Sequence, residues 1–147
     1  MNETASKALF DEDVGKIGER LLSSRNWELY SREFPVLDVG FRATGRPELR
    51  LRLHATNWND DPPSIEILGP DGTLLPPDRI PRGPTSVFNW NAHPLTGRTF
   101  VCMAGSREYH THNGHSADLW NNYKSKDAFR LGGILTQLWN AWLKTSP

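Results

Sequence analysis

The residues of this chain that could do chemistry gather in one stretch, NAHPLTGRTFVCMAGSREYHTHNGHS at positions 91–116. It holds the single cysteine, Cys102, and four of the five histidines, namely His93, His110, His112 and His115. A cysteine close to imidazoles suits two kinds of chemistry. Its thiolate is a strong nucleophile toward acyl groups, and it is also a ligand that zinc prefers. The stretch therefore predicts either a covalent acyl carrier or a metal site.

The three later histidines form the pattern H-x-H-x-x-H. On a strand, His110 and His112 would lie on one face, and on a helical turn His112 and His115 would do so. Either pair of imidazoles can hold a metal ion, although no C-x-x-C pair of the zinc-ribbon type accompanies them. A further interpretation is that Asn113-Gly114 forms a turn with solvated histidines around it, and that Cys102 is a buried apolar residue. The spacing alone leaves these interpretations open.

The length and composition of the chain limit the number of domains and the kinds of partner to be expected. A chain of 147 residues most naturally forms one domain, 1–147. The 17 basic and 17 acidic residues cancel, so the basic surplus that nucleic acids or anionic membranes attract is missing. One cysteine cannot form an internal disulfide, and no apolar run has the length of a signal peptide or a membrane span. We expect a soluble, cytoplasmic protein with no nucleic-acid or membrane partner.

Hydrophobic periodicity predicts a helix toward each end of the chain and strands between them. Apolar stripes predict helices over residues 4–24 and 129–142. Leu49, Leu51 and Leu53 alternate with polar residues, which is typical of a half-buried strand. Strands are expected at 34–43, 47–58, 64–69 and 85–90. The predicted fold is α+β, with a four-stranded antiparallel meander packed against both helices.

This order of helix, meander, irregular segment and helix resembles the ubiquitin-conjugating enzyme (UBC) superfamily. LLPPDRIP at 74–81 resembles the proline-rich turn of that family, and His93-Pro94 resembles the start of its His-Pro-Asn motif. Phe100-Val101-Cys102 resembles the lead into its catalytic cysteine. Leu95, however, stands in place of the motif's asparagine. The sequence is also similar to bacterial relatives encoded beside ubiquitin-like proteins and activating enzymes in anti-phage operons.

The resemblance implies an enzyme that carries an acyl group. It would accept a ubiquitin-like protein from an activating enzyme as a thioester on Cys102, and would transfer it to a protein amine. His110 and His112 are then the expected catalytic imidazoles, which raise the thiolate fraction or accept the proton of the amine. This chemistry uses no cofactor.

Other residues of the same stretch are expected to support that chemistry. The resemblance assigns supporting roles to His93, Glu108 and Asn113. The amide that is missing at position 95 would have to come from Asn89, Asn91 or Asn113, because an oxyanion needs a hydrogen-bond donor. The sequence does not choose among these three.

Two alternatives remain on the same fold. One neighbouring group of UBC-like proteins has a Cys-Glu-His-His signature and is described as metal-binding. In that alternative the chain is a non-catalytic component that holds zinc with Cys102, Glu108, His110, His112 and His115. The other alternative is a protein-interaction module whose histidine-rich loop has no chemical role.

Overall fold

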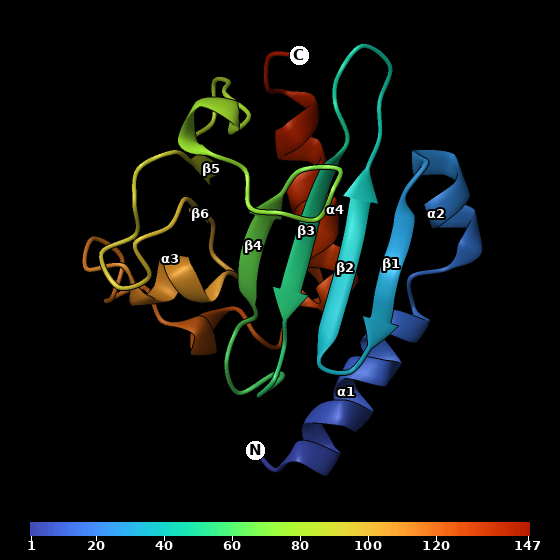
Figure 1. Cartoon of the computed structure of the whole chain (residues 1–147). Coiled ribbons are helices and arrows are strands. Elements are labelled where there is room, and N and C mark those ends of the chain that lie inside the picture. The colour runs from blue at the N-terminus through green and yellow to red at the C-terminus, as the bar shows by residue number, and fades with distance from the viewer.

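The computed structural model describes residues 1–147, and its elements run from two helices through a sheet and an irregular segment to a last helix (Figure 1). The helices are α1 (Glu3–Gly15), α2 (Glu19–Arg25), α3 (Arg107–Thr111) and α4 (Leu131–Leu143). The strands are β1 (Glu28–Glu33), β2 (Val36–Phe41), β3 (Leu49–His54), β4 (Ser64–Leu68), β5 (Phe88–Asn89) and β6 (Phe100–Val101). Short 3-10 turns lie at Pro77–Arg79, Trp120–Asn122 and Asp127–Phe129. The mixture of helices and an antiparallel sheet confirms the predicted α+β class.

The N-terminal apolar stripe folds as two helices, and not as the single helix predicted over residues 4–24. Helix α1 begins after Asn2, whose side-chain oxygen accepts a backbone N–H of the first turn at 2.8 Å. The break between α1 and α2 is flanked by Gly15 and Gly18, and glycine lowers helix stability. Ile17 lies within the break and is buried in the core. The apolar spacing thus continues across a turn that is not helical.

Strands β1 to β4 form one antiparallel sheet in sequence order. The alternation in β3 explains its two faces: Leu49, Leu51 and Leu53 are buried, while Arg50, Arg52 and His54 are only partly covered. Successive side chains of a strand point to opposite faces, so one face of the sheet is apolar and the other is polar. The predicted four-stranded antiparallel sheet is confirmed.

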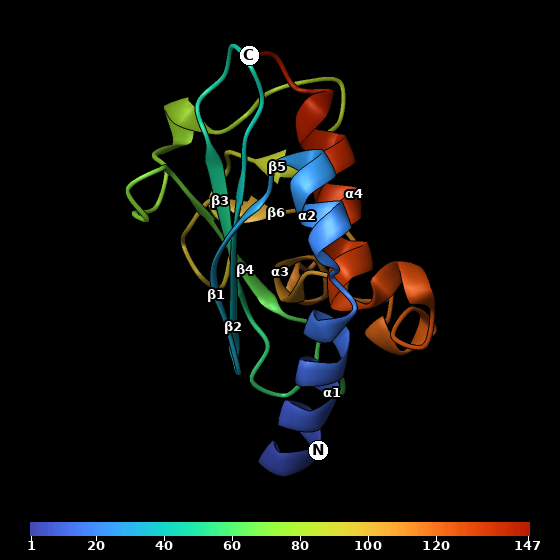
Figure 2. The ribbon, with the colours of Figure 1, turned by 90° about the vertical axis from the view of Figure 1, so that its right-hand side faces the viewer.

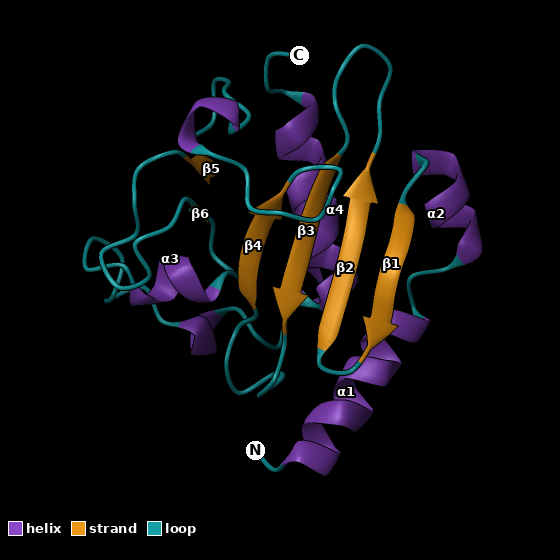
Figure 3. Cartoon of the chain, in the orientation of Figure 1, coloured by secondary structure: helices purple, strands orange, loops and turns teal.

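The membership of that sheet differs from the prediction. The edge strand β1, which no sequence pattern predicted, pairs with β2. Most of its side chains are exposed, so it lacks an apolar alternation. The strand predicted at 85–90 does not join the sheet. Its residues Phe88–Asn89 form β5, which pairs with β6 in a separate two-stranded sheet beside β4 (Figure 3).

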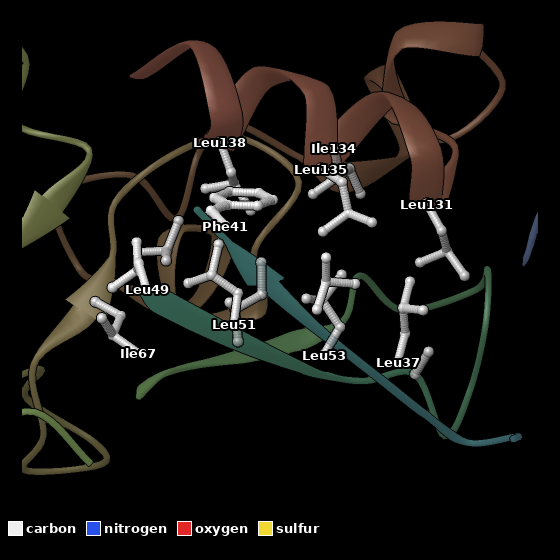
Figure 4. Close-up of a cluster of buried hydrophobic side chains, with 14 of the residues drawn as sticks. Leu37, Phe41, Leu49, Leu51, Leu53, Ile67, Leu131, Ile134, Leu135 and Leu138 are labelled. Atoms are coloured by element: carbon white, nitrogen blue, oxygen red, sulfur yellow. The ribbon is translucent and has the colours of Figure 1, made fainter. Parts of the chain in front are cut away.

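Helix α4 lies across the apolar face of the sheet, and α1 and α2 lie on the same side (Figure 2). The side chains of α4 that point at the sheet are fully buried, as Figure 4 shows for Leu131, Ile134, Leu135 and Leu138. Burial of one such side chain contributes about 1.5–3 kcal/mol. No helix of the chain has both the length and the apolar character needed to cross a bilayer.

The opposite face of the sheet is covered by paired charges. Asp38 on β2 accepts from Arg50 at 2.7 Å and from Arg52 at 3.1 Å. Glu66 on β4 accepts from Arg98 at 3.2 Å. Because Arg98 belongs to the loop between β5 and β6, this last pair ties the small sheet to the large one.

Candidate functional site

The β5–β6 hairpin positions Cys102. Residues Phe88 and Asn89 of β5 pair with Val101 and Phe100 of β6. One residue beyond this ladder, the Cys102 N–H donates to the Val87 carbonyl at 2.6 Å. The cysteine backbone is therefore fixed at the end of β6, and its side chain is half-buried.

The loop of this hairpin is closed by its own backbone. The His93 N–H donates to the Arg98 carbonyl at 2.8 Å, and the Gly97 N–H donates to the His93 carbonyl at 2.8 Å. Gly97 has a φ of 70°, a left-handed conformation that glycine adopts without steric cost. Leu95, at the place of the missing asparagine, is 74% exposed. The loop thus has a defined shape without that amide.

His93 supports the loop and does not face solvent. Its side chain is buried, Nε2 donates to the Glu108 carbonyl at 2.7 Å, and Nδ1 accepts the Leu95 N–H at 3.1 Å. Both ring nitrogens are therefore occupied. The ring also packs edge-on against Phe100 with 4.9 Å between centroids. These contacts give His93 a structural role in the loop.

Ser106 starts a short helix four residues after Cys102. Its buried hydroxyl donates to the Val101 carbonyl at 2.7 Å and accepts the Tyr109 N–H at 3.0 Å, as an N-cap residue does. The sequence pattern predicted an irregular segment here, and α3 was not predicted. The cap fixes the direction in which α3 leaves β6, and so it sets where the following histidines lie.

Glu108 fastens α3 to the large sheet. Its buried carboxylate accepts the Ile65 N–H at 2.7 Å and the Ser64 hydroxyl at 2.8 Å. Burial raises the pKa of Glu108, and the two hydrogen bonds lower it by less. Both oxygens accept hydrogen bonds within the protein, so Glu108 acts as a structural support in this structure.

We expect Glu108→Ala to lower the free energy of unfolding by about 2–3 kcal/mol, because it leaves the buried Ile65 N–H without an acceptor. Glu108→Gln is the matched control. Its amide oxygen can still accept that N–H, so the loss should stay below about 1 kcal/mol. Urea denaturation of the three proteins measures both values. Equal losses in the two variants would show that the hydrogen bond to Ile65 is not the stabilising contact.

His110 is also held by the protein. Its Nε2 accepts the Gly105 N–H at 3.1 Å, and its Nδ1 donates to the Asp118 carbonyl at 2.7 Å. Burial lowers the pKa of His110, which favours the neutral ring that this pair of hydrogen bonds requires. The imidazole expected to be catalytic thus closes the loop between α3 and Asp118, and it does not contact the thiol.

His112 lies at the end of α3 and faces the hairpin. Its ring stacks on Phe100 with 5.7 Å between centroids and a tilt of 23°, and it meets His93 edge-on at 5.7 Å. Its Nδ1 accepts the Gly114 N–H at 3.0 Å. The structure brings His112 close to the site, but it does not place His112 in hydrogen-bond contact with Cys102.

The imidazole that contacts the thiol is that of His115. Its Nε2 lies 3.7 Å from the Cys102 Sγ. His110 and His112 were the imidazoles expected at this place, and His115 was expected only as an alternative metal ligand. The turn that follows α3 reverses the chain here, and the His115 N–H donates to the His112 carbonyl at 2.9 Å. That reversal carries His115 back to Cys102.

Tyr109 packs on the His115 ring, and Asp118 anchors Tyr109. The two rings stack with 4.3 Å between centroids and a tilt of 14°. The Tyr109 hydroxyl donates to Asp118 at 2.6 Å, and the Tyr123 hydroxyl donates to the same carboxylate at 2.7 Å. The bond to Asp118 raises the pKa of Tyr109 to about 12. The two hydroxyls lower the pKa of Asp118, which keeps an ionised carboxylate near the ring.

Burial raises the pKa of the Cys102 thiol, and no cation offsets this effect. Burial therefore favours the protonated sulfur. Five cavities of about 340–530 Å³ are lined by other residues, so the thiol opens into none of these five. His115 is the one side chain in hydrogen-bond contact with the thiol and can take its proton.

The residues named for the zinc alternative do not converge on one point in this structure. No group of three or more histidine, cysteine, aspartate or glutamate side chains is placed to hold a metal ion. The Glu108 oxygens and both His110 nitrogens bind other groups of the protein. Zinc binding through Glu108 or His110 would require these side chains to leave their present partners.

None of the candidate asparagines donates to the thiol. The Asn89 side-chain oxygen accepts the Asn91 N–H at 2.8 Å, which shapes the start of the hairpin loop. Asn113 is exposed in the turn after α3. An oxyanion at Cys102 would have to find another donor, or one of these amides would have to move on substrate binding.

The site is thus a half-buried thiol paired with one oriented imidazole, between a small hairpin and the turn after α3. A thiol and imidazole in contact are the elements of nucleophilic acyl chemistry. Comparison of the sequence with protein-family models and with curated proteins found no match.

Proposed function

We propose that this chain is an acyl carrier of the ubiquitin-conjugating kind, with Cys102 as the residue that carries the acyl group. The observation that supports this most is the contact of 3.7 Å between the Cys102 Sγ and the His115 Nε2. Along the chain, the cysteine also follows the antiparallel sheet and precedes the C-terminal helix, as the UBC-like interpretation of the fold requires. The partners are a ubiquitin-like protein, its activating enzyme and a protein amine, as in a bacterial anti-phage conjugation system.

The loading step begins with proton transfer from the thiol to His115. The Cys102 sulfur then attacks the carbonyl of the thioester on the activating enzyme, a new C–S bond forms, and the enzyme's thiolate leaves and takes up a proton. The Asp118 carboxylate near the site stays ionised, because the Tyr109 and Tyr123 hydroxyls lower its pKa. Tyr109 holds the ring plane so that Nε2 points at the sulfur.

The discharge step reverses the roles. An amine attacks the Cys102 thioester, its C–N bond forms, and the Cys102 sulfur leaves as a thiolate that is protonated again. His115 can accept the proton that the amine loses, because a general base must lie within hydrogen-bond reach of the reacting group. This chemistry uses the chain's own residues and no cofactor.

The experiment that tests the function is incubation with an activating enzyme, ATP and a ubiquitin-like protein, followed by a non-reducing gel. We expect an adduct that a thiol reductant removes. A protein that contains stoichiometric zinc and reacts at Cys102 only after addition of a chelator would favour the metal alternative. If Cys102 is free and reactive but forms no adduct with any such partner, the protein-interaction module is the one alternative that remains.

The role of His115 can be tested without any partner protein. We expect His115→Gln to slow the alkylation of Cys102 by iodoacetamide at pH 7 by about tenfold, because the buried thiol loses its proton acceptor. His112→Gln is the matched control, since His112 belongs to the same loop but does not contact the sulfur. An equal loss of rate in both variants would show that the loop, and not the His115 contact, controls the thiol.

A further inference from the structure

We propose that Asn113 is a site of self-catalysed deamidation, with the His112 imidazole as the base. Of the ten asparagines in the chain, Asn113 is the one followed by glycine. Asn113 and Gly114 are both exposed, in the turn after α3. Glycine has no side chain to hinder the attack of its backbone nitrogen on the preceding amide. This inference does not depend on the carrier chemistry of Cys102.

The base is already bound to the proton that must leave. The Gly114 N–H donates to the His112 Nδ1 at 3.0 Å, which is within the distance that general-base catalysis requires. Because Nδ1 accepts this hydrogen bond, the ring proton of the neutral imidazole is on Nε2. The ring is held in place by its stack on Phe100 and its edge contact with His93.

The absence of a side chain at Gly114 brings the ring and the backbone together. A Cβ atom built on Gly114 would lie 3.2 Å from the His112 Nδ1, which is tighter than ordinary contact. The imidazole therefore occupies the space that another residue type at position 114 would need. Glycine thus serves the reaction twice, since it leaves the attacking nitrogen unhindered and lets the base approach it.

The reaction balances without any added reagent other than water. His112 Nδ1 takes the proton of the Gly114 nitrogen, and that nitrogen forms a bond to the side-chain carbonyl carbon of Asn113. The imidazolium returns the proton to the amide –NH2, the bond from that carbon to nitrogen breaks, and ammonia leaves. Water then opens the resulting succinimide at either carbonyl and gives aspartate or isoaspartate.

The product places a new carboxylate in the turn between His112 and His115. The formal net charge of the chain falls from zero to one negative charge. Where isoaspartate forms, the backbone also gains one methylene, which lengthens the turn that brings His115 to Cys102. A chemical change at Asn113 therefore alters both the charge and the geometry next to the thiol.

The test follows the full chain during incubation at pH 7.4 and 37 °C, with peptide mass mapping at intervals. We expect the mass gain that accompanies replacement of –NH2 by –OH to appear at Asn113 well before it appears at Asn91 or Asn121. Methyltransferase labelling should detect isoaspartate at the same position. The same chain unfolded in urea is the first comparison. Asn113 should react faster in the folded chain, because only there is His112 held against the Gly114 nitrogen.

Two variants complete the test. His112→Gln should slow the reaction at Asn113 by at least about tenfold, since it removes the base. His54→Gln, which changes a histidine on the far face of the sheet, should leave the rate unchanged. An unchanged rate in His112→Gln would overturn the proposal. If that variant does not fold, the deamidation rates of Asn113 in the folded and the unfolded wild-type chain are compared instead. A rate in the folded chain that is equal to or slower than the rate in the unfolded chain would overturn the proposal.

Discussion

Cys102→Ser is expected to convert a labile thioester with the ubiquitin-like partner into a stable oxyester, and Cys102→Ala is expected to abolish the adduct completely. Serine keeps an atom that can accept the acyl group, but its ester reacts more slowly with amines and resists thiols. Alanine offers no nucleophile. Non-reducing and reducing gels of the three proteins, each incubated with activating enzyme, ATP and partner, measure these outcomes.

The two variants also separate the alternatives for Cys102. Because Cys102 is half-buried and its contact is with a single imidazole, both substitutions should leave the free energy of unfolding nearly unchanged. A cysteine that held zinc would behave differently, since removal of one ligand lowers both the metal content and the stability of the fold. An adduct that persists in Cys102→Ala would show that another residue carries the acyl group.

The second large effect concerns stability. Asp13→Ala is expected to lower the free energy of unfolding by about 2–4 kcal/mol. The buried Asp13 carboxylate accepts the Trp58 indole N–H at 2.9 Å and the Leu131 N–H, the first of α4, at 3.4 Å. Alanine leaves both donors without a partner and disconnects α1 from the start of α4. Urea denaturation measures the loss.

Asp13→Asn serves as the control and adds a dependence on pH. Burial raises the pKa of Asp13, more than Arg130 and the hydrogen bonds lower it. A raised pKa contributes stability in full below the unfolded pKa, and this contribution is lost as the pH rises through the folded pKa. Asparagine does not ionise there. The stability of the wild type relative to Asp13→Asn should therefore fall from pH 3 to pH 7, and a rise would contradict the burial of this carboxylate.

The fold was predictable where one face of an element is buried. Leu49, Leu51 and Leu53 alternate because β3 is an inner strand of the sheet and only one of its faces packs against α4. The edge strand Glu28–Glu33 has no fully buried side chain, so its sequence carries no clear apolar alternation. The segment at 85–90 has strand character, but which sheet it joins depends on pairing with a distant partner, Phe100–Val101. The local sequence pattern therefore does not determine which sheet this segment joins.

The site was predictable in its residue types and less so in its contacts. The clustering of Cys102 with four histidines identified the segment. The choice of His115 as the partner depends on a reversal of the chain after α3, set by the hydrogen bond from the His115 N–H to His112. The one local signal for α3 was Ser106, a favoured N-cap residue. The stack of Tyr109 on His115 follows from that helix and has no signature of its own.

The claim that Cys102 carries an acyl group for transfer is tested most directly by a discharge measurement. Wild-type chain is loaded with the ubiquitin-like protein, ATP is removed, and a lysine-containing acceptor is added. The proposal predicts that the loss of the thioester accelerates with amine concentration and yields an amide with release of free Cys102 thiol. It also predicts that His115→Gln slows this discharge. Thioester loss at the same rate with and without the amine, giving only hydrolysed partner, would contradict the proposal.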